Sequence, residues 1–468
     1  MKMWSGRFRQ GLDPEFEKWQ RSFDYDKRLL PFELAASRAH ARALEHAGVL
    51  STEDLAEILE GLNKIEKLVK APEYFDDPEA EDVHHFVEKK LAALIGQTGY
   101  KLHAGRSRNE QIATDLRLFV RASIDDLQNL LADWIEAIVA RAESSGAAAM
   151  PGFTHLQPAE PVLVAHWLLA YAEMFLRDSD RLASCRKRLN LCPLGSGAIA
   201  GATLVINRRA IAAELGFDDI TANSMDATSD RDFAIEFVQA LLLLSLHLSR
   251  WAEEMILFST SAYDFVVLPE AYSTGSSAMP QKKNPDLLEL VRGKAARVAG
   301  FATALGTAVK GLPLAYNKDL QETQEPLFGA TDTVTSMLPL VTGWMRAVEF
   351  NFAKMDAEAR SGFMNAWAAA AYLVERGVAS RQAHEAVGKA VQICLDLKCN
   401  LQDLSIKDLK AIHPAFDADL PARLELSEVL AIHDVPGGTA AARVQAAIRA
   451  TRERAGLLKT ARAALVSD

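Results

Sequence analysis

Apolar residues recur with helical spacing along almost the whole chain, whereas alternating runs rich in β-branched residues are few. Polar breaks divide residues 26–110 into several medium-length helices, and residues 51–54 supply a capping sequence before one of them. Prolines interrupt the pattern over 72–78, and helical spacing resumes over 79–94. This part of the chain is therefore predicted to be a group of medium-length helices.

From residue 110 to about residue 352 the helical segments become much longer. A helix of about thirty residues is about 45 Å long, well above the average for globular proteins, so these lengths favour an elongated bundle. The predicted long helices cover residues 110–145, 160–190, 229–263, 285–311 and 322–352.

The segment 229–263 carries apolar residues on almost every face. Its most lipid-like run, 237–249, lies between Glu236 and Arg250 and falls short of the roughly twenty residues that a membrane span requires. We therefore predict a buried helix rather than a membrane span. A helix that is apolar all round must be covered on all sides, and the long helices of one chain cannot easily surround it. Subunits are expected to share the core.

After about residue 360 the segments shorten again. Short helices are predicted over 365–376, 380–399, 405–411 and 439–457, with a glycine turn at 433–439. The predicted fold is all-α, with an N-terminal helical domain (1–110), a central long-helix bundle (111–360) and a small C-terminal helical domain (361–468).

Composition places the chain among ordinary globular proteins, with 468 residues, 49% of them hydrophobic and 24% charged. The net charge of −10 argues against general affinity for nucleic acid or anionic membranes, although a local cationic pocket remains compatible with it. The spacings of Cys185, Cys192, Cys394 and Cys399 match neither zinc patterns nor a disulfide framework. Because residues 1–7 also lack an apolar signal core, we expect a cytoplasmic protein with reduced thiols.

The loop 275–286 combines glycine, serine and proline with two lysines and an asparagine, between two long helical segments. Ser276 or Ser277 beside Lys282 and Lys283 can both hold a carboxylate and move a proton. Loops of this composition are also commonly solvated and inert, so composition alone leaves both interpretations open.

Two other loops carry chemistry. Arg106, Arg108 and Asn109 directly precede a long helix, and both guanidinium groups and helix N-termini bind carboxylates. His155 lies between a threonine and a glutamine, before a predicted helix start that contains proline, and histidine titrates near neutrality. The arginine loop is equally compatible with a solvated basic turn, and a lone histidine in a loop is more often simply a surface residue.

Glu289 follows the serine–lysine loop on the next predicted helix. A carboxylate at that place can orient an imidazole and stabilise its charge. The alternative is an ordinary surface carboxylate on a helix face.

The loop 275–286 resembles the signature loop of the fumarase/aspartase superfamily, whose members release fumarate from a succinyl group. Its 281–284 version, Gln-Lys-Lys-Asn, is similar to that of the argininosuccinate lyase family. Residues 4–8, 105–109 and 315–319 resemble the same family. The resemblance implies a three-domain, all-helical fold, a homotetramer whose central helices form the core, and active sites assembled from three subunits.

The resemblance also implies roles for individual residues. Ser276 is expected to remove the proton from the succinyl Cβ, and His155, paired with Glu289, to protonate the leaving nitrogen. Lys282 and Asn284 are expected to hold the succinyl carboxylates. Further substrate contacts are expected from Ser22, Asn109, Thr154, Tyr316 and Gln321, with positive field from Arg106 and Arg108.

No metal or cofactor is expected, because the sequence contains no zinc pattern, phosphate loop or dinucleotide fingerprint. Two positions depart from the family pattern. Gln324 stands at a substrate-binding position where the family usually has lysine. Residues 158–160 are Pro-Ala-Glu, a version similar to that of adenylosuccinate lyases.

The resemblance implies cleavage of L-argininosuccinate into L-arginine and fumarate, the last step of arginine biosynthesis. Adenylosuccinate cleavage is one alternative, and a non-catalytic, crystallin-like structural role is another. A protein kept only for bulk need not retain Ser276, His155, Lys282 and Glu289 together.

The apolar segment 229–263 yields a testable prediction about assembly. Light scattering at micromolar concentration should give a mass well above that of one chain, because burial of this segment requires several copies, and the family resemblance implies the mass of four chains. A monomeric mass under these conditions would refute the shared core.

Overall fold

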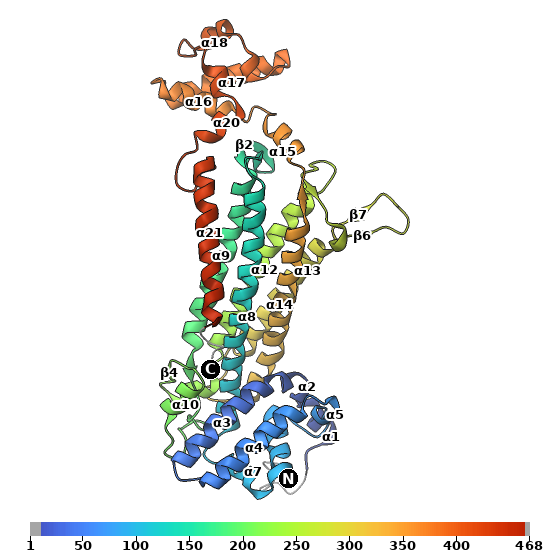
Figure 1. Cartoon of the computed structure of the whole chain (residues 1–468), viewed down its shortest axis with the longest axis vertical. Helices are drawn as coiled ribbons and strands as arrows, with labels where there is room; N and C mark the ends of the chain where they lie inside the picture. The colour runs from blue at the N-terminus through green and yellow to red at the C-terminus, as the bar shows by residue number, and fades with distance from the viewer. Residues whose placement is uncertain (1–10, 464–468) are drawn as a thin grey trace. The chain divides into compact units, whose positions relative to one another are not determined.

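A computed structural model describes residues 11–463, with side chains described as far as residue 459. The motif predicted at residues 4–8 lies outside the described residues. The described chain is mostly helical, as predicted, and its strands are short (Figure 1).

The first part of the chain folds into the helices α1 (Pro14–Trp19), α2 (Phe23–Asp26), α3 (Leu30–His46), α4 (Thr52–Leu68), α5 (Pro72–Phe75), α6 (Val83–Ile95) and α7 (Gln97–Lys101). Of these, α3, α4 and α6 have the predicted medium length and the others are short. The predicted cap of α4 is a complete capping box. The Ser51 hydroxyl accepts a hydrogen bond from the Asp54 amide at 3.1 Å, and the Asp54 carboxylate accepts one from the Ser51 amide at 3.2 Å.

The predicted long helices are confirmed to within a few residues. They are α8 (Arg108–Ser144), α9 (Val164–Leu189), α12 (Asp232–Phe258), α13 (Asp286–Ala308) and α14 (Gln324–Ala347). Helices α12 and α14 end several residues earlier than predicted. A turn segment follows α12 before β5 (Val266–Val267), which pairs with β8 (Glu349–Phe350) just after α14. Strand pairing there satisfies backbone groups that a longer helix would have used.

The predicted helix start at residue 160 is wrong. The chain instead forms an antiparallel hairpin of β1 (Ala149–Thr154) and β2 (Gln157–Leu163), and α9 begins only at Val164. The turn residues His155 and Leu156 both have positive φ, at 55° and 58°. Turns of this kind usually contain asparagine and glycine, so the sequence lacked the usual hairpin signal.

The described chain divides into two compact units. The first comprises Met1–Asp126, Arg181–Leu242 and Arg297–Thr333, and the second comprises Leu127–Asp180, Leu243–Ala296 and Val334–Asp468. The first unit also contains α10 (Arg208–Glu214), α11 (Ser224–Ser229) and the parallel pair β3 (Leu191–Cys192) and β4 (Asp219–Ile220). The predicted three-domain division of the sequence remains a prediction.

Three tryptophans hold the long helices of the second unit together. Trp251 packs edge-on against Trp134 and Trp344, with ring centroids 4.9 Å and 5.1 Å apart. All three side chains are fully buried. Since each belongs to a different helix, the stack ties α8, α12 and α14 to one another.

The later part of the second unit has a hydrophobic cluster of its own, built from residues 368–429 and including Tyr372, Cys394 and Phe416. Its helices are α16 (Ala366–Glu375), α17 (Ser380–Leu397), α18 (Ile406–Ile412), α19 (Leu420–Arg423) and α20 (Leu426–Ala431). Helices α15 (Phe352–Ala359) and α21 (Ala441–Ala463) precede and follow this segment in the sequence.

By length and composition alone, helix α12 is long and apolar enough to cross a membrane. The shorter run 237–249 did not indicate this. The most apolar window of α12 is 44% buried inside the chain. Leu241, Leu244 and Leu248 are buried, whereas Leu243 and Leu246 are 39% and 45% exposed. A single chain thus covers this helix only in part, as predicted, and its coverage by other subunits remains a prediction.

Candidate active site

In the first unit, several predicted site residues gather around Glu81 and Asp82, just before α6. The Glu81 carbonyl accepts a hydrogen bond from the Ser22 amide at 2.9 Å. An Arg108 guanidinium nitrogen lies 2.8 Å from the Asp82 carboxylate and 3.4 Å from that of Glu81, and the Lys318 ammonium lies 3.7 Å from Glu81. The acidic pair therefore joins the 22, 108 and 318 regions, which are far apart in sequence.

Asp26 positions the side chain of Ser22. The Ser22 hydroxyl donates to the Asp26 carboxylate at 2.6 Å, and the Val83 amide donates to the other oxygen at 3.0 Å. Burial, together with the nearby charge of Asp82, raises the pKa of Asp26 to about 7. The Ser22 hydroxyl thus rests against a carboxyl group that titrates near neutrality.

Tyr316 and Gln321 belong to the same unit. The side-chain amide of Gln321 donates to the backbone carbonyl of Gln20 at 3.0 Å. Gln20 lies two residues before Ser22 in the sequence. Burial raises the pKa of Tyr316, and the nearby Arg231 opposes that rise. Gln321 is therefore held by a hydrogen bond within the chain, and Tyr316 is buried in the field of Arg231.

Arg231 is a residue that the sequence interpretation missed. Its side chain is 2% exposed, and Nε and Nη2 have no hydrogen-bond partner among the described residues, while Nη1 donates to the Asp230 carbonyl at 2.8 Å. Burial lowers the pKa of Arg231 to about 10. A charged residue at the start of the apolar segment 229–263 was the available signal. Gln324 in the same unit is also buried, and its Oε1 has no hydrogen-bond partner in the described part of the chain.

Arg106 and Arg108 point to different surroundings. Arg106 is buried and donates to the Ser37 hydroxyl at 3.0 Å, whereas Arg108 pairs with the acidic residues before α6. Asn109 lies in the first turn of α8, and its backbone N–H donates to the Ser107 hydroxyl at 3.3 Å. The structure assigns Arg106 a contact inside the chain, and its predicted role toward substrate remains a prediction.

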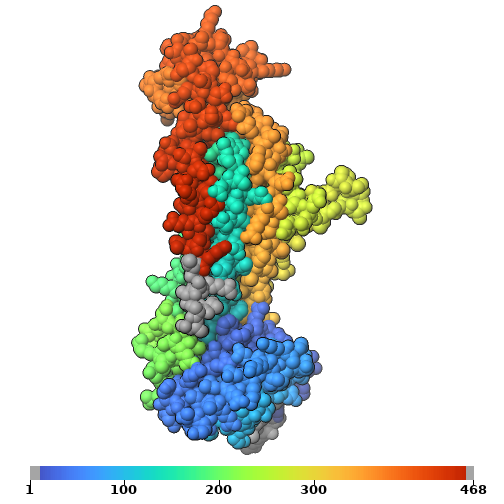
Figure 2. All heavy atoms as spheres, in the orientation of Figure 1, coloured from blue at the N-terminus to red at the C-terminus, as the bar shows by residue number. Residues whose placement is uncertain are grey.

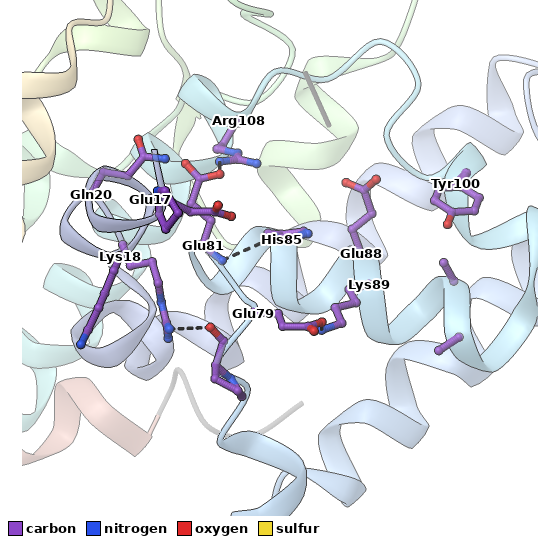
Figure 3. Close-up of a pocket in the computed structure, with 15 residues that line it drawn as sticks. Glu17, Lys18, Gln20, Glu79, Glu81, His85, Glu88, Lys89, Tyr100 and Arg108 are labelled. Carbon is purple, nitrogen blue, oxygen red and sulfur yellow. Dashed lines mark hydrogen bonds and ion pairs between the residues drawn. The ribbon is translucent and has the colours of Figure 1, made fainter. Parts of the chain in front are cut away.

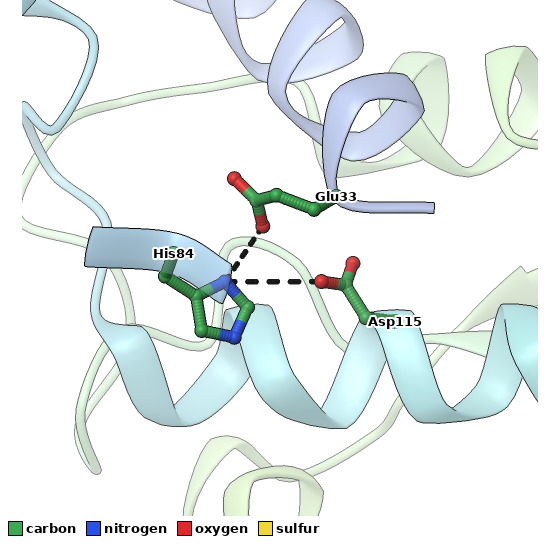
Figure 4. Close-up of side chains that lie close together, drawn as sticks. All are labelled: Glu33, His84 and Asp115. Atoms are coloured by element: carbon green, nitrogen blue, oxygen red, sulfur yellow. Dashed lines mark hydrogen bonds and ion pairs between the residues drawn. The ribbon is translucent and has the colours of Figure 1, made fainter. Parts of the chain in front are cut away.

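A buried cluster of Glu33, His84 and Asp115 joins α3, α6 and α8 (Figure 4). His84 Nδ1 lies 2.7 Å from the Glu33 carboxylate and 3.8 Å from that of Asp115. Burial opposes ionisation of Glu33, but His84 outweighs it and lowers the pKa of Glu33 to about 2. Burial and the charge of Glu33 raise the pKa of Asp115 well above its usual range.

These shifts describe an ionised Glu33 beside a protonated His84 and a neutral Asp115. The ligand atoms lie within 4.8 Å of one another, a spacing that a metal ion could also use. The short contact between Glu33 and His84, with Ser37 donating to Glu33 at 2.7 Å, fits a shared proton instead. We therefore interpret the cluster as a hydrogen-bonded junction between helices.

A cavity of about 870 Å³ lies in the first unit, with Arg108 and Glu81 on its wall (Figure 3). In that view Arg108 and Glu81 lie on one side, and Glu88 and Tyr100 on the other. Arg108 is the predicted site residue that lines this cavity. A molecule that enters the cavity therefore reaches the Arg108 guanidinium.

In the second unit, the loop 275–286 is closed at its base by β6 (Thr274–Gly275) and β7 (Lys283–Asn284). The loop stands away from α13 in the ribbon view and projects as a separate lobe in the space-filling view (Figures 1 and 2). The side-chain amide of Asn284 donates to the Gly275 carbonyl at 3.3 Å. The Lys282 side chain is exposed. The predicted loop is confirmed, and it presents its lysine to solvent.

Ser276 lies at the start of this loop. Its hydroxyl oxygen accepts hydrogen bonds from the backbone amides of Ala278 at 3.3 Å and Met279 at 3.1 Å. Two N–H donors aimed at a hydroxyl oxygen stabilise the negative charge that the oxygen gains when it loses its proton. The turn thus gives Ser276 an environment suited to a base.

His155 lies at the tip of the β1–β2 hairpin and is exposed, as is Thr154. A left-handed conformation at a residue other than glycine costs about 1–2 kcal/mol, so other interactions must hold the turn. Glu289 lies on α13, 3.9 Å from Arg292. No hydrogen bond among the described residues joins His155 to Glu289 or Ser276, so the predicted meeting of these three groups remains a prediction.

The fold and one family model define the class of protein. Residues 6–300 match a model described as lyase. A solved structure of EDDS lyase in complex with formate has a TM-score of 0.82 at 26% identity, covering 96% of this chain and 92% of that one. The 3-carboxy-cis,cis-muconate lactonizing enzyme from Pseudomonas putida shares the fold, with a TM-score of 0.72 at 20% identity, covering 95% and 100%. The fold class is that of the fumarase/aspartase superfamily.

More similar relatives define the family within that class. Residues 363–431 match a model described as argininosuccinate lyase C-terminal. The argininosuccinate lyase of Koribacter versatilis is 59% identical over 454 residues, covering 97% of each chain. That of Acidobacterium capsulatum is 56% identical over 468 residues, covering 99% of this chain and 96% of the relative. The chain belongs to the argininosuccinate lyase family, a family of carbon–nitrogen lyases.

The Asp26 carboxyl yields a prediction about stability and pH. Because the folded-state pKa of about 7 exceeds the ordinary value of 3.8, the folded chain keeps a proton that the unfolded chain releases between these values. Asp26 therefore makes stability fall as pH rises through that window. As the pH rises from about 4 to about 7, the unfolding free energy of Asp26→Asn should increase by about 1–4 kcal/mol relative to that of wild type. Urea denaturation at several pH values measures this difference.

The exposed neighbour Asp24 provides the control, since Asp24→Asn should leave the pH dependence unchanged. Parallel stability curves for wild type and Asp26→Asn would contradict the raised pKa.

Proposed function

We propose that the protein catalyses the reversible β-elimination of L-argininosuccinate to L-arginine and fumarate. Its family membership supports this substrate, because its relatives at 59% and 56% identity carry the name argininosuccinate lyase. The observation that carries the chemistry is the Ser276 hydroxyl, which accepts two backbone hydrogen bonds in an exposed loop.

Ser276 removes a proton from the Cβ of the succinyl group. That proton is very weakly acidic, because its loss places a second negative charge on the adjacent carboxylate. Amide donors at Ser276 favour the deprotonated oxygen, and loop closure over substrate would exclude water. Lys282 and Asn284, on the same loop, hold the carboxylates on which the charge develops, and each such donor is typically worth about 10²–10³ in rate.

His155 supplies the second proton transfer. After Cβ loses its proton, the electron pair forms the double bond of fumarate and the Cα–N bond breaks, so the departing nitrogen needs a proton. His155 donates it, and Glu289 stabilises the charged imidazole. The strained turn that presents His155 is consistent with a functional position, since backbone strain tends to persist at such sites.

The remaining predicted residues bind substrate. Thr154 and Asn109 contact the succinyl part, and Ser22, Tyr316 and Gln321 contribute further contacts, within the positive field of Arg106 and Arg108. Gln324 offers a neutral amide at a position that is usually cationic in the family. The buried Arg231 supplies a positive charge near Tyr316, another of the residues proposed to bind substrate.

A complete site requires several copies of the chain. His155, Ser276 and Glu289 have no mutual hydrogen bond among the described residues, and exposed leucines on α12 lack cover. We propose a homotetramer with sites assembled from three subunits, acting in the cytoplasm in arginine biosynthesis. The same assembly would cover Leu243 and Leu246 of α12.

The substrate assignment is tested by following the ultraviolet absorbance of fumarate. Purified protein should produce fumarate from argininosuccinate and little or none from adenylosuccinate. Preference for adenylosuccinate would move the protein to the other lyase activity. Failure with both compounds would support a structural, crystallin-like role instead.

The role of Ser276 is tested by Ser276→Ala. Loss of the base should lower kcat by about 10²–10⁴-fold while KM for argininosuccinate changes little, measured by steady-state kinetics. Ser277→Ala is the matched control, because Ser277 is the exposed neighbour in the same loop and should retain near-normal turnover. Equal losses in the two variants would point to loop disruption and would refute the assignment.

A further inference from the structure

Cys394 and Cys399 lie together at the C-terminal end of α17. The Cys399 amide donates to the Cys394 carbonyl at 3.1 Å, and the Lys398 amide bonds to the same carbonyl. Lys398 between them is left-handed, with φ 54° and ψ 45°. This is a Schellman helix end, in which the residues at these two positions normally make an apolar side-chain contact. Here both positions of that contact are cysteines.

The two thiols are hydrogen-bonded to each other but differ in burial. Cys394 is fully buried in the hydrophobic cluster of residues 368–429, and Cys399 is half-buried against the same cluster. Burial, reinforced by the hydrogen-bonded thiol of Cys399, raises the pKa of Cys394 to about 12. Cys394 therefore stays protonated and enclosed, and Cys399 is the sulfur that a solute reaches first.

We propose that Cys394 and Cys399 form an oxidative modification site, at which a peroxide converts the thiol pair into an intrachain disulfide. In the first step the Cys399 thiol gives up its proton and its sulfur attacks a peroxide oxygen. The O–O bond breaks, a sulfenic acid forms, and the departing hydroxide takes up the thiol proton and leaves as water. In the second step the Cys394 sulfur attacks the sulfenic sulfur, and its proton leaves with the hydroxyl group as a second water. The peroxide is thereby reduced by two electrons and the thiol pair is oxidised by two.

The helix end already supplies the geometry that the bond requires. A disulfide requires two cysteines whose backbones lie close together. Here the backbone N–H of Cys399 lies 3.1 Å from the carbonyl oxygen of Cys394, and the two thiols are hydrogen-bonded to each other. The other two cysteines lack this arrangement. Cys185 donates to the Phe233 carbonyl at 3.7 Å, while Cys192 lies in β3, and burial raises the pKa of each to about 12. Only the α17 pair combines mutual contact with a partly exposed thiol.

Lys398 makes the test unambiguous, because trypsin cleaves between the two cysteines. The native full-length protein is treated with hydrogen peroxide, its remaining thiols are alkylated, and it is denatured and digested without reductant. Tryptic peptides 390–398 and 399–407 then stay joined only through a disulfide. We expect the joined species in mass spectra after peroxide, lacking two hydrogen atoms relative to the reduced pair, and its loss on adding reductant.

Two controls accompany this measurement. Cys399→Ser should abolish the joined species, and Cys394→Ser should let Cys399 proceed to sulfinic and sulfonic acids because no second thiol intercepts it. Peptides 182–186 and 189–208, which carry Cys185 and Cys192, should stay separate. The proposal is overturned if peptides 390–398 and 399–407 remain alkylated after peroxide. It is also overturned if wild-type Cys399 is over-oxidised as fast as in Cys394→Ser, or if the disulfide joins two chains.

Discussion

The buried hydrogen bond between Glu33 and His84 is the interaction on which the first unit depends. It joins α3 to α6, and Asp115 extends the contact to α8. An ionised carboxylate inside a protein is costly unless it is paired and hydrogen-bonded, and Glu33 is both. Because Asp82 and Arg108 begin the two helices that meet at this junction, the same contact sets where their ion pair forms.

That ion pair in turn organises the residues proposed to bind substrate. The backbone N–H of Ser22 bonds to the Glu81 carbonyl, and its hydroxyl bonds to Asp26. The Lys318 ammonium lies close to the Glu81 carboxylate. Each contact is modest alone, since partly exposed pairs contribute little energy. Their shared value is geometric, because they hold groups from distant parts of the chain in one place.

The groups proposed for proton transfer are arranged differently. Ser276 and His155 lie in an exposed loop and an exposed hairpin turn of the second unit, each shaped by local hydrogen bonds or by backbone strain. Local order thus shapes the surroundings of each group within one chain, and we propose that the assembly of several chains brings the groups together. This proposal agrees with the exposure of leucines on α12 in the single chain.

The sequence by itself determined the helices, because periodicity and caps act over a few residues. The long helices and the capping box at Ser51 were predicted for that reason, as were the serine–lysine loop and its candidate base. Only the tertiary structure decided the hairpin at His155, whose turn lacks the usual residues. It also decided the contacts of Asp82 with Arg108 and of Cys394 with Cys399, because packing and a helix end, rather than sequence spacing, bring those side chains together.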